Sequence, residues 1–106
     1  MTWPLDADGD VFRRLDASEF DFRQVHLIDF NVDFAAWPPP DAAIAALREN
    51  YPDLIIFEPD EHGEGYIRFK IKSVLTYELV VFVQKSVSAL VVPYGGTCES
   101  WGVMQS

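Results

Sequence analysis

The sequence is poor in cysteine, histidine and basic residues, and each shortage excludes a class of protein. Its 106 residues include one cysteine, two histidines and eight lysines or arginines. Cys98 has no second cysteine to pair with, so a disulfide scaffold is excluded. With 17 acidic residues the net charge is −9, which repels phosphate backbones. We expect no direct nucleic-acid binding, since only a small patch, Arg68, Lys70 and Lys72, could support it.

Long hydrophobic runs are also missing. The longest mostly apolar stretch, residues 79–94, is interrupted by four polar residues and is shorter than a bilayer span. The N-terminal residues MTWPLDADGD lack the basic start and apolar run of a secretory signal. We therefore expect a cytoplasmic protein with no membrane anchor.

The chain has enough apolar residues for one hydrophobic core. At 49% hydrophobic and 24% charged residues, it predicts a single domain over residues 1–106 that needs no metal, cofactor or disulfide. The charge is uneven, at −5 over residues 1–34, −6 over 35–66 and +2 over 67–106. Such an acidic surface keeps a small protein soluble or steers a basic protein segment toward it.

Hydrophobic periodicity predicts the first five elements. A short helix is expected at residues 10–15, behind the acids Asp6, Asp8 and Asp10. Residues 25–34 alternate apolar and polar side chains as a strand does, and residues 41–51 carry a helical apolar stripe. Residues 53–59 and 66–73 predict two strands of a hairpin, because residues 60–65 form a polar loop with two glycines.

The segment of residues 76–92 is ambiguous, since its β-branched residues favour a strand. At 100° per residue, however, its large apolar residues fall on one face, which predicts a helix. Thr76 is the expected N-cap, and Gly95 or Gly96 the expected positive-φ exit. A final strand is expected at about residues 99–104.

This order predicts an α+β, ferredoxin-like sandwich: a four-stranded antiparallel sheet with two crossover helices on one face, preceded by a short N-terminal helix. The first and third strands are neighbours in that topology. Asp29 and Asp33 should therefore lie beside Arg68, Lys70 and Lys72 on the face away from the helices.

Motifs at both ends resemble those of a known family. The residues DGDVFRRLDASEFDF and HLIDFNVDF and the C-terminal YGGTCESWG are similar, in order and spacing, to the regulator of ribonuclease E activity B (RraB) family. The chain has Glu19 where the family pattern has glycine, and ESWG where the pattern resembles D-G-W. The matching motif residues are Asp8, Gly9, Asp10, Asp21, Phe22, Tyr94, Gly95, Gly96, Trp101 and Gly102.

The resemblance implies a ferredoxin-like, non-enzymatic protein that binds ribonuclease E and restrains RNA cleavage through protein contacts. We expect the motif residues to be mostly structural, with Tyr94, Gly95 and Gly96 forming a helix exit and Trp101 anchoring the last strand. Candidate partner-binding residues are Asp29, Asp33 and Trp101.

Two other classes of function stay open on the sequence. One is a self-associating structural or immunity-like module without a ribonuclease partner. The other is an enzyme with Cys98 as nucleophile, which would need His26 or His62 beside it. A calcium loop at residues 6–17 fails, because Val11 and Ala17 occupy positions that require glycine and a bidentate acid. We expect no metal at the acidic loop around His62, and we interpret the residues WPPP at 37–40 as a rigid connector rather than a polyproline ligand.

Overall fold

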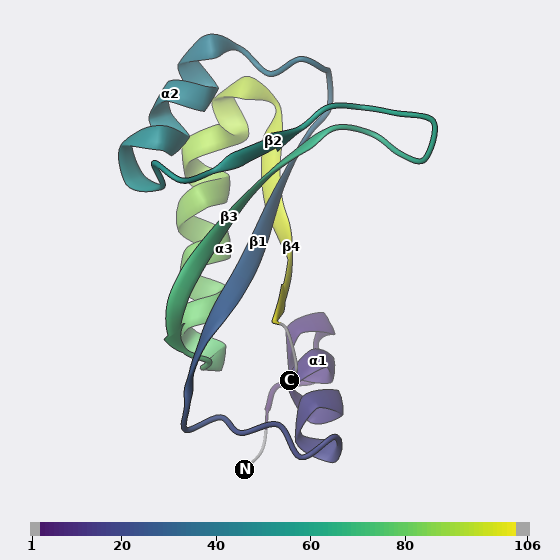
Figure 1. The fold of residues 1–106 in the computed structure, drawn as a ribbon, viewed down its shortest axis with the longest axis vertical. Helices are drawn as coiled ribbons and strands as arrows, with labels where there is room; N and C mark the ends of the chain where they lie inside the picture. The colour runs from purple at the N-terminus through teal and green to yellow at the C-terminus, as the bar shows by residue number, and fades with distance from the viewer. Residues whose placement is uncertain (1–2, 104–106) are drawn as a thin grey trace.

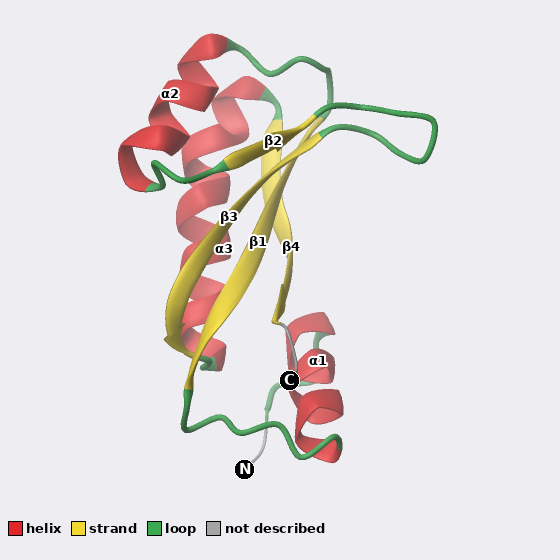
Figure 2. Ribbon diagram, in the orientation of Figure 1, coloured by secondary structure: helices red, strands yellow, loops and turns green. Residues whose placement is uncertain are grey.

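The computed structural model describes residues 3–103, in which four antiparallel strands form one sheet in the order β2-β3-β1-β4. The elements are α1 (Ala7–Ala17), β1 (Val25–Phe34), α2 (Asp41–Asn50), β2 (Ile55–Phe57), β3 (Tyr66–Val74), α3 (Tyr77–Val91) and β4 (Gly96–Val103). The helices α2 and α3 cover one face of the sheet, and α1 lies at the end of β4 (Figures 1 and 2). This is the predicted ferredoxin-like arrangement.

The side chains of the central strand β1 alternate between the two faces of the sheet. Ile28, Phe30, Val32 and Phe34 are buried toward the helices, while Asp29 and Asn31 alternate with them on the other face. Phe30 stacks on Phe69 of β3 with ring centroids 5.4 Å apart. The period of two seen in the sequence therefore fixes which side of the sheet carries the core and which side stays open.

The ambiguous segment is a helix, as its periodicity predicts. Thr76 caps it by accepting a hydrogen bond from the Leu79 amide at 3.1 Å. Its buried residues are spaced three and four apart: Val80, Val83, Val87 and Val91. Packing of this stripe against the sheet outweighs the strand propensity of valine, because propensity differences are small beside the free energy of burial.

Several predicted boundaries are wrong by a few residues. Helix α1 starts at Ala7 rather than residue 10, because Asp6 accepts a hydrogen bond from the Gly9 amide and caps a polar first turn. Strand β2 covers Ile55–Phe57 only, since Leu54 closes a turn onto the Tyr51 carbonyl and Pro59 cannot donate to a ladder. Strand β4 starts at Gly96 rather than residue 99, and residue 104 lies outside the described range.

The core lies between the sheet and the two covering helices, and Phe12 and Leu15 of α1 extend it alongside the last residues of β4. Among residues 3–103, no side-chain nitrogen or oxygen is buried without a hydrogen-bond partner. None of the described helices combines the length and the apolar character needed to cross a bilayer.

Candidate functional site

The motifs from the two ends of the chain meet at Asp8. Its Oδ1 accepts a hydrogen bond from Trp101 Nε1 at 2.9 Å, and its Oδ2 accepts one from Gln84 Nε2 at 3.0 Å. The Trp101 ring also contacts Phe12, with ring centroids 5.4 Å apart. One carboxylate thus links α1, α3 and β4, so Asp8 and Trp101 hold the N-terminal helix onto the domain.

The neighbours of Asp8 in the acidic motif also have structural partners. Gly9 is buried, and a Cβ at this position would lie 1.9 Å from the Pro4 carbonyl oxygen. Asp10 forms an ion pair with Arg13 on the same helix. Only glycine allows the segment before α1 to approach the helix this closely.

The second motif pair, Asp21 and Phe22, shapes the link from α1 to β1. The Asp21 carboxylate accepts a hydrogen bond from the Arg23 amide at 2.9 Å, which lowers the pKa of Asp21. Phe22 packs between Phe12 and Phe20, with ring centroids 5.9 and 4.9 Å away. This link therefore contributes aromatic surface to the end of the molecule where α1 lies.

The C-terminal glycine motif forms the helix exit. After α3, Val92–Tyr94 make one 3₁₀ turn, and Gly95 has φ 78°, a conformation that L side chains rarely adopt. Gly96 then pairs with Phe34, and Gly102 lies opposite Asp29 on β1. The motif turns the chain from α3 directly into β4.

The face of the sheet away from the helices has a charge pattern. Asp29 lies opposite Lys70 in the β1–β3 register, with Oδ1 and Nζ 3.7 Å apart. Asp33 lies opposite Tyr66 instead, and partial burial together with Glu64 and Glu99 raises the pKa of its carboxyl. This open face is therefore acidic around Asp33, while Lys70 and Lys72 lie further along β3 toward its other end.

A series of hydrogen-bonded side chains crosses the middle of the open face. Arg68 Nε donates to Asn31 Oδ1 at 3.0 Å, and Asn31 Nδ2 donates to Ser100 Oγ at 3.3 Å. The Arg68 guanidinium also lies over the Phe57 and Tyr66 rings, 5.4 and 5.6 Å from their centroids. Sequence patterns did not predict these two hydrogen bonds, because the residues that form them are 37 and 69 positions apart.

The structure does not bring the three candidate partner-binding residues together. Asp29 and Asp33 share the open face with Lys70, as expected. Trp101 lies opposite Phe30 in the register, so it belongs to the helix side, where it is half-buried against α1. Only the two aspartates are therefore available together on one surface.

Cys98 lies in the core and lacks the surroundings of a nucleophile. It is 1% exposed, and burial raises the pKa of its thiol to about 12, with smaller contributions from Asp33 and Glu99. His26 Nε2 instead lies 2.9 Å from the Asp21 carbonyl oxygen, and His62 is exposed in the β2–β3 loop beside Glu61. Within residues 3–103, no group of three or more histidine, cysteine or acidic side chains could hold a metal ion.

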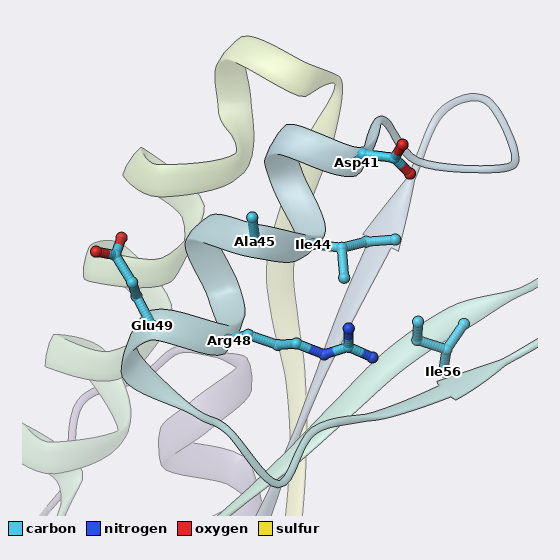
Figure 3. A pocket seen from close by; sticks show the side chains of 6 residues that line it. All are labelled: Asp41, Ile44, Ala45, Arg48, Glu49 and Ile56. Atoms are coloured by element: carbon cyan, nitrogen blue, oxygen red, sulfur yellow. The ribbon is translucent and has the colours of Figure 1, made fainter.

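A broad, open depression of about 570 Å³ lies between α2 and the edge strand β2 (Figure 3). Ile44 and Arg48 project from α2 toward Ile56 of β2, while Glu49 points away from it. No described polar side chain is buried in it without a partner. Its lining mixes apolar side chains with the charged Asp41, Arg48 and Glu49.

These features define a small ferredoxin-like α+β domain with an open sheet face and an N-terminal helix held by the C-terminal strand. The family model for RraB, described as Regulator of ribonuclease activity B, matches residues 5–103. The chain therefore belongs to the RraB family. No curated protein and no solved structure matches it.

Proposed function

We propose that this chain is a non-enzymatic, cytoplasmic regulator that restrains a ribonuclease through protein contact, with ribonuclease E as the first candidate partner. The observation that carries the proposal is the family match over residues 5–103, which includes both end motifs and the whole sheet. Regulation of ribonuclease activity is what the family description states.

The charge of the chain supports contact with protein rather than with RNA. At a net charge of −9 the domain repels a polyanion. Of the three basic residues on the open face, Arg68 is bonded to Asn31 and Lys70 is near Asp29. These three positive charges are few against the 17 acidic residues of the chain, so the field of the whole molecule disfavours a phosphate backbone.

The open face is the proposed contact surface. At its acidic end, partial burial and the nearby Glu64 and Glu99 raise the pKa of Asp33, so a cationic group from a partner would be favourable there. Val25 and Leu27, at the other end of β1, are 54% and 53% exposed and offer apolar area. A partner surface with bases and apolar side chains complements this face.

The test is a cleavage assay with purified full-length ribonuclease E and a fluorescent RNA. We expect the protein to slow cleavage in a saturable manner, to cut no RNA alone and to leave RNA mobility in native gels unchanged. Asp33→Lys should weaken the inhibition about tenfold, equivalent to ~1.4 kcal/mol of binding. The matched control is Glu61→Lys, the same charge change in the exposed β2–β3 loop, which should retain inhibition.

Two outcomes would contradict the proposal. One is cleavage or binding of RNA by the protein alone. The other is a stable dimer in sedimentation that leaves ribonuclease E activity unchanged, which would favour the self-associating module instead.

A further inference from the structure

An aromatic pocket lies at the end of the molecule where α1 and the start of α3 meet. Its volume is about 470 Å³, within the range of ligand sites, and it is more enclosed than the depression at β2. The side chains and backbone that line it come from four separate segments: Trp3, Pro4, Phe12, Phe22, Arg23, Leu75, Thr76, Tyr77 and Glu78.

Hydrogen bonds and ring contacts fix the walls of this pocket. Arg13 Nη1 donates to the carbonyl oxygens of Trp3 and Pro4 at 3.1 and 3.0 Å, which holds the N-terminal segment against α1. The Trp3 ring lies 5.5 Å from both the Phe12 and the Phe22 rings. The pocket is thus formed before any ligand arrives, which lowers the entropic cost of binding.

The walls keep apolar surface accessible to solvent. Trp3, Phe22 and Tyr77 are only partly buried although they pack against the core. Leu5, one residue past the pocket wall at Pro4, is 95% exposed. Aromatic pockets with an apolar margin are where interfaces place their main anchor residues.

The charges around the pocket are mostly negative. Glu78 lines it, and three further acids contact residues that build or support its wall. Asp6 accepts a hydrogen bond from Tyr77, Asp10 forms an ion pair with Arg13, and Asp21 forms one with Arg23. Against these four acids stand two bases, Arg13 and Arg23, so the surroundings carry −2. The hydrogen bond from Tyr77 is the main cause that lowers the pKa of Asp6, so this carboxylate stays ionised at neutral pH.

We propose that this aromatic pocket binds one large apolar side chain from a basic peptide segment of a partner protein. The ring walls take the apolar side chain, and the acids around the rim attract the flanking lysines or arginines. The inference goes beyond the proposed function, because it concerns a surface other than the open face and does not require the partner to be a ribonuclease.

The experiment uses synthetic peptides and the whole chain. The probe is a fluorescein-labelled Lys-Arg-Phe-Arg-Lys peptide, with binding followed by anisotropy at low salt. We expect saturable binding that weakens at least tenfold when the phenylalanine is replaced by alanine. A Glu-Asp-Phe-Asp-Glu peptide should also bind at least tenfold more weakly, because its charges face the acids of the rim.

Two variants locate the site. Glu78→Lys should weaken binding of the basic peptide roughly five- to tenfold, whereas Glu61→Lys, with the same change in net charge, should have an effect under about twofold. Trp3→Ala should remove the dependence on phenylalanine, and its circular dichroism would show whether the domain remains folded. Amide shifts on adding the probe should be largest for Phe22, Leu75 and Tyr77.

Three results would overturn this inference. The first is an equal effect of Glu78→Lys and Glu61→Lys, which would mean that the peptide responds to the overall charge of the protein and not to this pocket. The second is amide shifts centred on Leu27 and Lys70, which would place the peptide on the open face. The third is a dimer that excludes the peptide, which would make a second copy the occupant. Since no ribonuclease is present, none of these results bears on the cleavage assay.

Discussion

At the scale of single residues, Asp8 shows how one side chain can join distant parts of the chain. Its two carboxylate oxygens accept from Trp101 and Gln84, which are 93 and 76 residues away in sequence. Hydrogen bonds to a charged acceptor are stronger than neutral ones, and both donors are partly buried. The acidic motif near the start of the chain and the tryptophan near its end therefore share one structural role in this protein.

Replacing this carboxylate tests that role. We expect Asp8→Ala to lower the free energy of unfolding by about 2 kcal/mol, because Trp101 Nε1 and Gln84 Nε2 both lose a charged acceptor. Urea denaturation followed by circular dichroism measures this change. Asp16→Ala is the matched control on the same helix, since Asp16 is exposed and its removal takes an acid away from the helix C-terminus. Equal losses for the two variants would contradict the prediction.

At the scale of elements, the end of α1 shows that the position of Glu19 suits glycine. The Phe20 amide bonds the Leu15 carbonyl and the Glu19 amide bonds the Asp16 carbonyl, both at 3.0 Å, which is a Schellman motif. Glu19 occupies its left-handed position with φ 62°. Glycine is preferred at this position because a Cβ there meets backbone atoms.

Introducing glycine at this position should therefore stabilise the domain. We expect Glu19→Gly to raise the free energy of unfolding by up to about 1 kcal/mol, since relief of the left-handed conformation exceeds the added freedom of the unfolded chain. Thermal and urea unfolding measure the gain. Glu19→Ala separates the backbone effect from the loss of charge, because alanine keeps the strain. A gain from alanine as large as that from glycine would assign the effect to charge instead.

At the scale of the whole molecule, the net charge of −9 acts on stability as well as on binding. The described residues contain four ion pairs, one of them a histidine beside Glu61, and all involve at least one exposed side chain. Such pairs contribute little, so most of the acidic excess repels itself in the folded state.

Salt should accordingly stabilise this protein. Raising sodium chloride from about 10 to about 300 mM screens the repulsion, and we expect the melting temperature to rise by roughly 5 °C. A variant with both Glu61→Lys and Glu64→Lys has a net charge of −5, because each change adds two positive charges, and its rise should be smaller. Differential scanning calorimetry provides the measurement. A melting temperature that falls with salt would show that favourable ion pairs dominate.

Local patterns predicted most of the elements but not where each one ends. Alternation along residues 25–34 predicts both the strand and its buried face, and Thr76 with the valine stripe predicts α3 against its strand propensity. Topology then places Asp29 next to Lys70. The helix and strand ends were less accurate, because capping by Asp6 and the short pairing of β2 depend on hydrogen bonds that the apolar pattern does not encode.

The sequence by itself determined the element types, the order of the strands, the acidic character of the chain and its likeness to the RraB family, because each depends on periodicity, composition or local motifs. Only the tertiary structure decided that Trp101 faces Asp8 on the helix side, that Asn31 links Arg68 to Ser100, and that four segments form one aromatic pocket. These contacts join residues far apart in the chain, and their geometry depends on how the helices pack on the sheet, which no local pattern specifies.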